Sequence, residues 1–298
     1  MIAVFKNIKK LSHNGERTLA LIVRGLRKNG LPAEIVNLED IEIFLEKGKT
    51  RVLIGKKSIL DYKMIYFRKV GTCRNVAFIL SNLAKKRNIP FLDQFYPYTS
   101  TRGKLIQMFL LASRKLPIPK TYHSLVYNNK KIKNATSYLK LPLVVKATNF
   151  GGGRMVYLVK NKKEIKRIIK KHPDTEFILQ EFIKNNFDYR IMVLGGTASV
   201  AEKRIRTRKK EFRNNACVGG KEIFLDVKDI PRKIIALAIQ AAKVTDVQIA
   251  GVDIVRDPHG KDYIFEVNPA PSLSLNVEGS YELDELVKYL TKCAKRVL

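Results

Sequence analysis

The chain of 298 residues has few cysteines and no long hydrophobic run. Its three cysteines, Cys73, Cys217 and Cys293, are odd in number and form no C-x-x-C pair, which argues against a disulfide framework or a zinc site. No apolar run approaches the roughly 20 residues that a membrane-spanning helix needs. The start, MIAVFKNIKK, holds only a short apolar run before Lys6, so it predicts a strand rather than a signal peptide. We therefore expect a cytoplasmic protein without a membrane partner.

Acidic residues are scarce. The chain has 27 Asp and Glu residues against 57 Lys and Arg residues, which gives a formal net charge of +30. Such a charge attracts anions over a Debye length of about 10 Å, and the candidates are nucleic acid, anionic lipid, nucleotides and acidic proteins or peptides. A lysine-rich but merely solvated surface is the alternative. A hydrophobic content of 45% excludes a disordered chain.

Residues 1–100 alternate between strand and helix patterns. Within ERTLALIVRGL, apolar residues recur at helical spacing from Leu19 to Leu26. This alternation is typical of a parallel, Rossmann-like α/β sheet, although the segment has neither a dinucleotide fingerprint nor a P-loop. The predicted elements are strand 1–5, helix 16–26, strand 33–38, strand 64–69, helix 75–86 and strand 89–93.

The rest of the chain predicts two α+β units. The first contains helices near 101–113 and 162–171 and strands near 141–147, 155–159 and 177–183. The second contains strands near 187–196, 198–205, 248–255 and 263–268, a helix at 231–244 and a terminal amphipathic helix. We therefore expect three domains, namely residues 1–100, 101–184 and 185–298.

Two strand patterns flank the turn sequence Asp257-Pro258-His259-Gly260. Placing the turn at its centre pairs Asp253 with Ile264, and the period of two then puts Asp253, Glu266 and Asn268 on one face. Two carboxylates and an amide oxygen are ligands that magnesium prefers. A solvated polar strand face and a pair of acids for glycoside hydrolysis are the alternatives.

A glycine run follows a strand that ends in lysine. In VVKATNFGGG, the backbone of Gly151, Gly152 and Gly153 can approach a phosphate, and Lys146 can add a charge to the same anion. Lys104, at the start of a helix, is a second candidate phosphate contact, against the alternative of simple solvation.

A third segment, ILQEFI, carries Gln180 and Glu181 in an apolar strand and is followed by Asp188. Its backbone could bond to an adenine edge, and Asp188 could accept hydrogen bonds from ribose hydroxyls.

Taken together, these motifs resemble the ATP-grasp superfamily and, within it, the RimK-like amino-acid ligases, which include glutamate ligases. The segments VVKATNFGGG, QEFI, DYRIMVLGG, FRNNACVGG, AGVDIV and FEVNPAPS occur in order over about two-thirds of the chain. The resemblance implies an ATP-grasp fold, of mixed α/β and α+β class, preceded by a Rossmann-like domain. Cys217-Val218 precede the paired glycines where His or Arg is common in the family.

The resemblance also implies roles for individual residues. The implied ATP contacts are Lys104, Lys146, Gly151, Gly152, Gly153, Gln180, Glu181, Phe182, Ile183, Asp188, Arg213, Asn214 and Asn215. The implied magnesium ligands are Asp253, Glu266 and Asn268, for two Mg²⁺ ions, with Mn²⁺ as an alternative. Arg213, Arg204 and Arg190 are the implied catalytic residues, which would hold the transferred phosphoryl group or the acyl substrate.

The implied reaction joins a carboxylate to an amine at the expense of ATP, through an acylphosphate. The segment KRIRTRKKEFR (203–213) holds seven basic residues and predicts a loop that gathers an acidic substrate, such as glutamate or a glutamate-rich peptide tail. Other acceptors of the carrier-protein, D-alanine or glutathione type stay open. A nucleic-acid binder that uses the basic helix 160–171 is a less favoured alternative, and a homo-oligomer is implied only by the resemblance.

Overall fold

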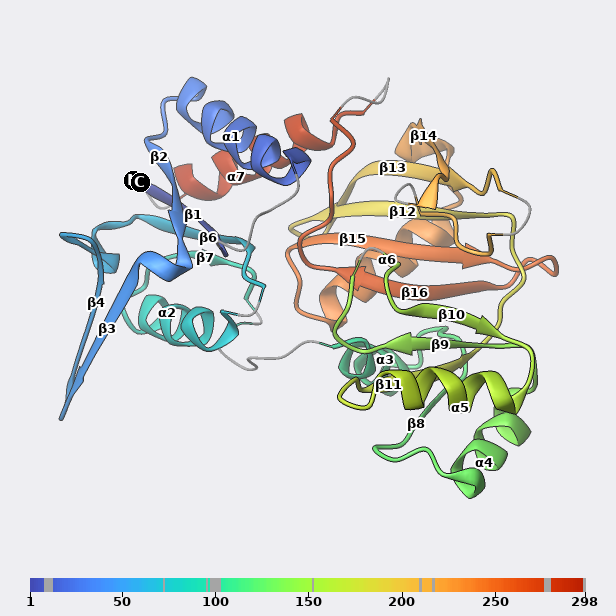
Figure 1. Ribbon diagram of the computed structural model, residues 1–298. Helices are drawn as coiled ribbons and strands as arrows, with labels where there is room; N and C mark the ends of the chain where they lie inside the picture. The colour runs from blue at the N-terminus through green and yellow to red at the C-terminus, as the bar shows by residue number, and fades with distance from the viewer. Residues whose placement is uncertain are drawn as a thin grey trace.

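A computed structural model of the protein describes residues 1–7, 13–71, 73–94, 96, 103–151, 153–208, 211–215, 218–275 and 280–296. Figure 1 shows an N-terminal unit, in blue and cyan, beside a larger body that holds most of the remaining chain. Within the described residues, no helix is both long and apolar enough to cross a membrane.

The N-terminal unit contains β1 (Ile2–Lys6), α1 (His13–Lys28), β2 (Ala33–Asn37), β6 (Met64–Lys69), α2 (Arg74–Lys86) and β7 (Phe91–Leu92). Its four strands are all parallel and lie in the order β2-β1-β6-β7. Alternate residues of β1 and β6 pack on α1 and on α2, so both faces of the sheet are covered. Strands buried on both faces read as continuous apolar runs. The sheet agrees with the Rossmann-like prediction.

An antiparallel sheet between β2 and β6 is absent from the predicted elements. It consists of β3 (Ile41–Glu46), β4 (Lys49–Ile54) and β5 (Lys57–Ser58), and short 3₁₀ helices flank it as η1 (Leu38–Asp40) and η2 (Ile59–Asp61). The sequence IEIFLEKGKTRVLI carries its signal, because two alternating segments surround a Lys-Gly turn.

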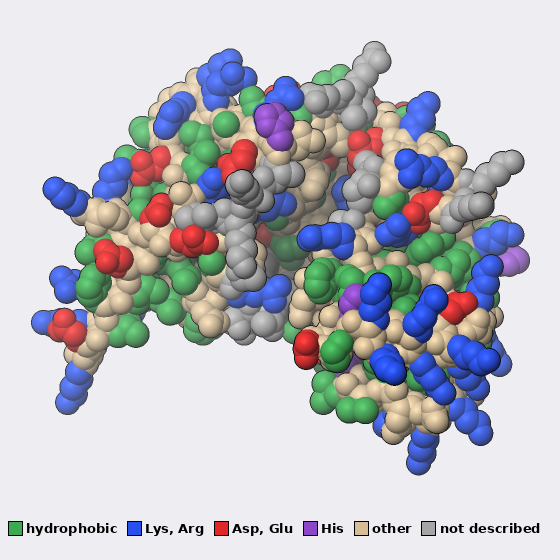
Figure 2. Space-filling model, in the orientation of Figure 1, with side chains coloured by type: hydrophobic (Ala, Val, Ile, Leu, Met, Phe, Trp, Pro, Cys, Tyr) green, Lys and Arg blue, Asp and Glu red, His purple; other side chains and the backbone are tan. Residues whose placement is uncertain are grey.

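The small unit contains α3 (Lys104–Ser113), β8 (Thr121–His123), α4 (Asn129–Leu139), β9 (Leu143–Ala147), β10 (Val156–Val159), α5 (Lys162–Lys171) and β11 (Phe177–Glu181). Its sheet has the order β10-β9-β11-β8. The apolar sides of α4 and α5 pack on this sheet through a cluster that includes Ile132, Ile165 and Val145. Their outer sides carry lysines and arginines, which gather over this part of the surface in Figure 2.

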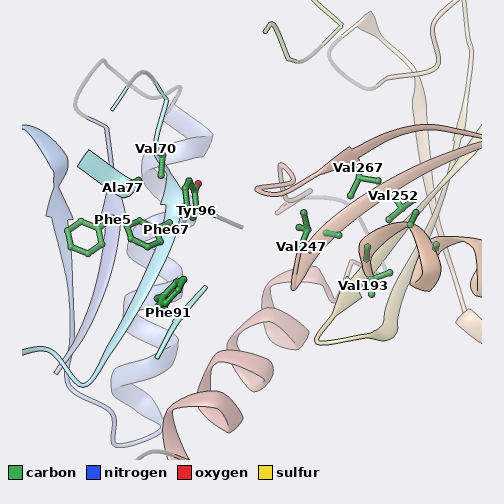
Figure 3. Close-up of a cluster of buried hydrophobic side chains, with 14 of the residues drawn as sticks. Phe5, Phe67, Val70, Ala77, Phe91, Tyr96, Val193, Val247, Val252 and Val267 are labelled. Atoms are coloured by element: carbon green, nitrogen blue, oxygen red, sulfur yellow. The ribbon is translucent and has the colours of Figure 1, made fainter. Parts of the chain in front are cut away.

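The large sheet consists of β12 (Phe187–Leu194), β13 (Thr197–Ile205), β14 (Lys221–Leu225), β15 (Ile249–Arg256) and β16 (Asp262–Asn268). Its order is β14-β13-β12-β15-β16. After the 3₁₀ helix η4 (Val227–Asp229), α6 (Arg232–Val244) covers one face of the sheet. Figure 3 shows Val193, Val252 and Val267 in this layer, apart from the aromatic group of Phe5, Phe67 and Phe91 in the N-terminal unit. On the opposite face, Met192, Leu194 and Val200 join the apolar cluster of the N-terminal unit, and Asp188 and Asp253 make the remainder polar.

The last helix, α7 (Glu282–Lys295), packs on α1 at the other end of the chain (Figure 1). Leu286 and Leu290 share a buried cluster with Leu19 and Ile22. The division into residues 1–100, 101–184 and 185–298 stays a prediction, and this contact joins its last segment to its first.

Candidate active site

A cleft lies between the small sheet and the polar face of the large sheet. Twelve of the predicted site residues line it, and they are Lys104, Lys146, Gly153, Glu181, Phe182, Ile183, Asp188, Arg213, Asn214, Asn215, Asp253 and Glu266. Gly151, Gln180, Arg190, Arg204 and Asn268 are not among the lining residues, and Gly152 lies outside the described residues.

The carboxylate hairpin brings Asp253 and Glu266 together, but in a different register from the predicted one. Asp253 pairs with Glu266, whereas Ile264 pairs with Ile254. Two local features explain the correction. The loop spans five residues, closed by the N–H of Asp257 donating to the carbonyl of Lys261 at 2.9 Å, and Phe265 has no cross-strand partner and so forms a bulge.

The bulge sets the direction of the Glu266 side chain. Ile264 is fully buried in the cluster that includes α6, while Phe265 and Glu266 both line the cleft. In a regular strand, Glu266 would share the face of Ile264, because side chains alternate with a period of two. The predicted common face for Ile264 and Glu266 was therefore wrong, whereas Asp253 and Glu266 do share one face.

Beneath the cleft floor, two arginines hold two aspartates. Arg190 Nε and Arg204 Nη2 contact the two oxygens of Asp253 at 2.8 and 3.2 Å, and Arg204 Nε donates to Asp188 Oδ1 at 2.6 Å. Burial pushes the pKa of Asp253 up, but the two guanidiniums outweigh it and lower the pKa below its ordinary value. Burial raises the pKa of Asp188 more than Arg204 lowers it. Arg190 and Arg204 thus position the carboxylates from below.

Asp188, the predicted ribose contact, is only 5% exposed. Its second oxygen accepts a hydrogen bond from Asn214 Nδ2 at 3.4 Å, and the same amide donates to Asn185 at 2.7 Å. Asp188 therefore lies at the edge of the cleft with both oxygens already bonded.

Two lysines from the small unit and α3 enter the same cleft. The ammonium of Lys104 lies 3.1 Å from Glu266 Oε1 and also donates to the carbonyl of Phe150. Lys146, on β9, places its ammonium 4.8 Å from the centre of the Phe265 ring. Burial lowers the pKa of Lys146 to about 8, against the opposing effect of Glu266. A buried cation of this kind is stabilised by an incoming anion.

The glycine loop after β9 is held by an arginine from the following unit. Arg213 Nη1 donates to the carbonyl of Gly153 at 2.6 Å, and Arg213 Nη2 pairs with Glu211 at 2.7 Å. Hydrogen bonds from Arg213 lower the pKa of Glu211 to about 2. Asn215 lines the cleft beside Arg213. An anion bound here would compete with Glu211 for the guanidinium.

The predicted adenine segment lines the cleft through its last residues. The N–H of Glu181 donates to the carbonyl of Lys120, and its side chain accepts from the N–H of Lys120 at 2.8 Å. The side chain of Gln180 is instead buried and donates to Thr121 at 2.8 Å, so it contributes to the sheet rather than to the cleft.

Sequence reasoning missed the apolar lining, namely Pro119, Val144, Val156, Phe212 and Phe265. Such side chains are common in sites for flat aromatic rings. Val144 could have been found from its spacing, since it precedes Lys146 by two residues on β9 and so shares its face.

The predicted metal ligands fit an ion that arrives together with phosphates. Asn268 lies two pairs beyond Glu266, opposite Gly251, and so shares the face of Glu266. In the described part of the chain, no group of three or more His, Cys, Asp or Glu could hold a metal ion. The donor set is therefore two carboxylates and an amide, and magnesium commonly takes one or two carboxylates plus substrate phosphates. The oxygens of Asp253 keep spare lone pairs despite their guanidinium contacts.

The fold is shared with solved ATP-grasp ligases. The ATP-grasp ligase PsnB complexed with a minimal precursor matches with a TM-score of 0.71 at 15% sequence identity, covering 100% of this chain and 99% of that chain. The macrocyclase MdnC bound with the precursor peptide MdnA, from Microcystis aeruginosa MRC, matches with a TM-score of 0.71 at 13% identity, covering 99% of each chain.

Sequence comparison gives the family. A probable alpha-L-glutamate ligase of Legionella pneumophila (strain Corby) is 28% identical over 214 residues, covering 69% of this chain and 68% of the relative. Probable alpha-L-glutamate ligase 2 of Hahella chejuensis is 31% identical over 210 residues, covering 67% of this chain and 66% of the relative. The family model for the RimK-like ATP-grasp domain matches residues 101–285. With more than half of its length matched, the chain belongs to the RimK-like ATP-grasp family.

Proposed function

We propose that this protein is an ATP-dependent carbon–nitrogen ligase that joins an amino acid such as L-glutamate to a carboxylate of an acidic peptide, protein tail or small molecule. One observation carries the proposal. A single cleft brings Lys104 and Lys146 together with Asp253 and Glu266. Cations for phosphates and oxygen ligands for magnesium thus meet at one place, as phosphoryl transfer requires.

ATP would lie along the cleft with its adenine in the apolar end. The flat faces of the adenine ring would pack there against the side chains of Val144, Val156 and Phe182. The backbone after Glu181 would form hydrogen bonds with the adenine edge. The triphosphate would then extend past the Gly151–Gly153 loop toward Lys146 and Lys104. Arg213, Asn214 and Asn215 would contact it from the large unit.

The reaction needs alignment and charge neutralisation rather than a protein nucleophile. A substrate carboxylate oxygen attacks the γ-phosphorus, the bond to the bridging oxygen breaks, and an acylphosphate and ADP form. An amine then attacks the acyl carbon, phosphate leaves, and the amine nitrogen loses a proton as the amide forms. Bound Mg²⁺ or Mn²⁺, which we propose as two ions held by Asp253, Glu266 and Asn268, neutralises phosphate charge. Arg213 would exchange Glu211 for a phosphoryl oxygen.

Two sets of relatives support an acidic or peptide substrate. The sequence relatives are named as probable glutamate ligases, and the structural relatives were solved with precursor peptides. In this chain, Arg206 and Arg208 lie between the end of β13 and the cleft residue Arg213, and their charge would attract acids toward the cleft.

The test is a screen for ADP release. Purified protein is incubated with ATP, Mg²⁺ and pairs drawn from the common amino acids and glutamate-rich peptides, and ADP and new amide products are measured. We expect ADP release that depends on both an acid and an amine, with a mass gain equal to one or more residues. Absence of ATP binding, of magnesium binding and of ADP release with every pair would contradict the enzyme proposal.

A further inference from the structure

The N-terminal sheet has a feature that the proposed ATP site does not use. From β1 the chain passes to β2 on one side, and β6 and β7 then lie on the other side of β1. The strand order therefore reverses between β1 and β6. In open parallel sheets, ligands bind outside the carboxyl ends of the strands at such a point. The residues at that end of β6 are Arg68 and Lys69.

Arg68 is a buried cation with unused hydrogen-bond donors. Its side chain is only 2% exposed, and Nη2 donates to the carbonyl of Pro271 at 2.6 Å. Nε and Nη1 form no well-directed hydrogen bond, although the buried hydroxyl of Tyr66 lies near the guanidinium and interacts with it. A guanidinium has five N–H groups in a planar fork. Because Pro271 takes only one of them, one edge of the group can still receive a carboxylate. Leaving such donors buried and unpaired is costly.

Lys69 lies beside Arg68 and forms no ion pair with a carboxylate among the described residues. Its ammonium donates to the carbonyl of Ala270 at 3.1 Å. Burial, together with the charge of Arg68, lowers the pKa of Lys69 to about 7. Lys6, at the same end of the neighbouring strand, is by contrast neutralised by Glu16 at 2.9 Å. At this end of the sheet, Arg68 and Lys69 thus form no close ion pair among the residues that the structure describes, and the buried carboxyl of Glu282 acts on Arg68 only at longer range.

This pair lies next to the proposed metal ligands. Both side chains contact the Pro269–Pro271 segment, which directly follows Asn268. Pro271 in turn packs on Gly251, where an added Cβ would lie 2.7 Å from Pro271 Cβ and 3.7 Å from Arg190 Nε. Gly251 pairs with Asn268, two residues from Asp253. Figure 2 shows the surface hollowed where the N-terminal unit meets the larger body.

We propose that Arg68 and Lys69 form a carboxylate subsite that anchors the acidic substrate through a carboxylate other than the one that reacts. The inference rests on the proposed ligase function and deepens it. The partly exposed Lys69 forms the outer contact, and Arg68 the inner one. The nitrogens of Arg68 are covered in this structure, so entry of the carboxylate requires the Pro269–Pro271 segment to move aside.

The experiment compares Arg68→Gln and Lys69→Gln with Lys63→Gln. Lys63 is exposed before the opposite end of β6, so its variant loses the same charge in the same unit. The probes are L-glutamate and a tetraglutamate peptide, with L-glutamine as the neutral analogue. We measure KM from ADP release and the Kd for ATP. Losing a charge-assisted hydrogen bond should raise KM for the acidic probe roughly tenfold or more.

The outcomes separate the subsite from the ligase proposal. Arg68→Gln should leave the Kd for ATP within about twofold and abolish the preference for glutamate over glutamine, as one lost ion contact predicts. If the wild type releases ADP with an acidic probe and both variants keep its KM, the subsite is wrong and the ligase proposal stands. If the wild type binds no ATP and releases no ADP with any substrate, the ligase proposal fails first. Should Arg68→Gln not fold, Arg68→Lys and Lys69→Gln decide instead.

Discussion

Asp253 and Glu266 face each other directly across β15 and β16, yet they are neutralised by different elements. Asp253 is held from within its own sheet by Arg190 and Arg204. Glu266 is held by Lys104 from α3, a helix that packs on β16 through Gln107 and Val267. The first carboxylate is thus fixed within the sheet, and the second depends on a helix outside it.

This difference predicts effects of different size for two conservative substitutions. Asp253→Asn removes the negative charge and one of the two acceptor oxygens that face two buried guanidiniums, and it should lower the free energy of unfolding by about 3 kcal/mol or more. Glu266→Gln removes a partly exposed contact and should change it by less than about 1 kcal/mol. Urea unfolding measures both.

Magnesium-dependent turnover completes this comparison. Glu266→Gln combined with Asn268→Ala should abolish turnover in a folded protein, because two proposed oxygen ligands are lost. Turnover that survives in this double variant would show that β16 does not hold the metal.

Lys146 should make ATP binding depend on pH. Its pKa of about 8 in the folded protein lies below the ordinary value of 10.5, so its charge is lost as the pH rises through 8. The affinity for ATP should be constant below that pH and fall above it. The free energy of unfolding should rise between about pH 8 and 10.5, because the unfolded chain then binds more protons.

Lys146→Arg is the matched control for this titration, since a guanidinium stays charged in that range. A plot of log Kd for ATP against pH should bend near 8 in the wild type and show no bend in the variant. An identical bend in both proteins would assign the titration to another group.

Gly25 sets the distance between the first and last helices. A Cβ at this position would lie 2.7 Å from Val287 Cγ2. Gly25→Ala gains about 1 kcal/mol of helix propensity, but overpacking typically costs about 1–3 kcal/mol, so we expect net destabilisation. Val287→Ala in the same chain should remove the clash, and thermal unfolding of the single and double variants tests this coupling. Additive effects would contradict it.

The basic segment 203–213 should act on the acidic substrate and not on ATP. Arg206 bonds to the carbonyl of Asn185 at 3.0 Å, so its loss would also disturb the loop. Arg208 is exposed and is the better target, together with Lys209 and Lys210, which lie outside the described residues. Neutralising these three should raise KM for a glutamate peptide several-fold and leave KM for ATP unchanged, because long-range attraction acts on the charged substrate. Unchanged KM values for both would leave the segment without a substrate role.

The sequence predicted most elements because their patterns are local. Helix 162–171 and strand 64–69 have the predicted bounds, since spacing and caps define them. The bulge at Phe265 could not be predicted, because it reconciles a five-residue loop with a buried Ile264 and an outward Glu266. Motif order located the lysines and carboxylates of the cleft. It did not locate Arg68, because its unused donors are visible only once Pro271, some 200 residues away, lies beside it.

The contact between α1 and α7 also bears on how the protein is made. During synthesis, α1 leaves the ribosome long before the leucines of α7 that cover it, because Leu286 comes 260 residues after Leu26. The apolar side of α1 therefore stays partly uncovered while the residues between them are made, a condition that favours chaperone capture or aggregation. Loss of the fourteen-residue helix α7 should therefore be poorly tolerated, even though α7 is not among the elements that line the cleft.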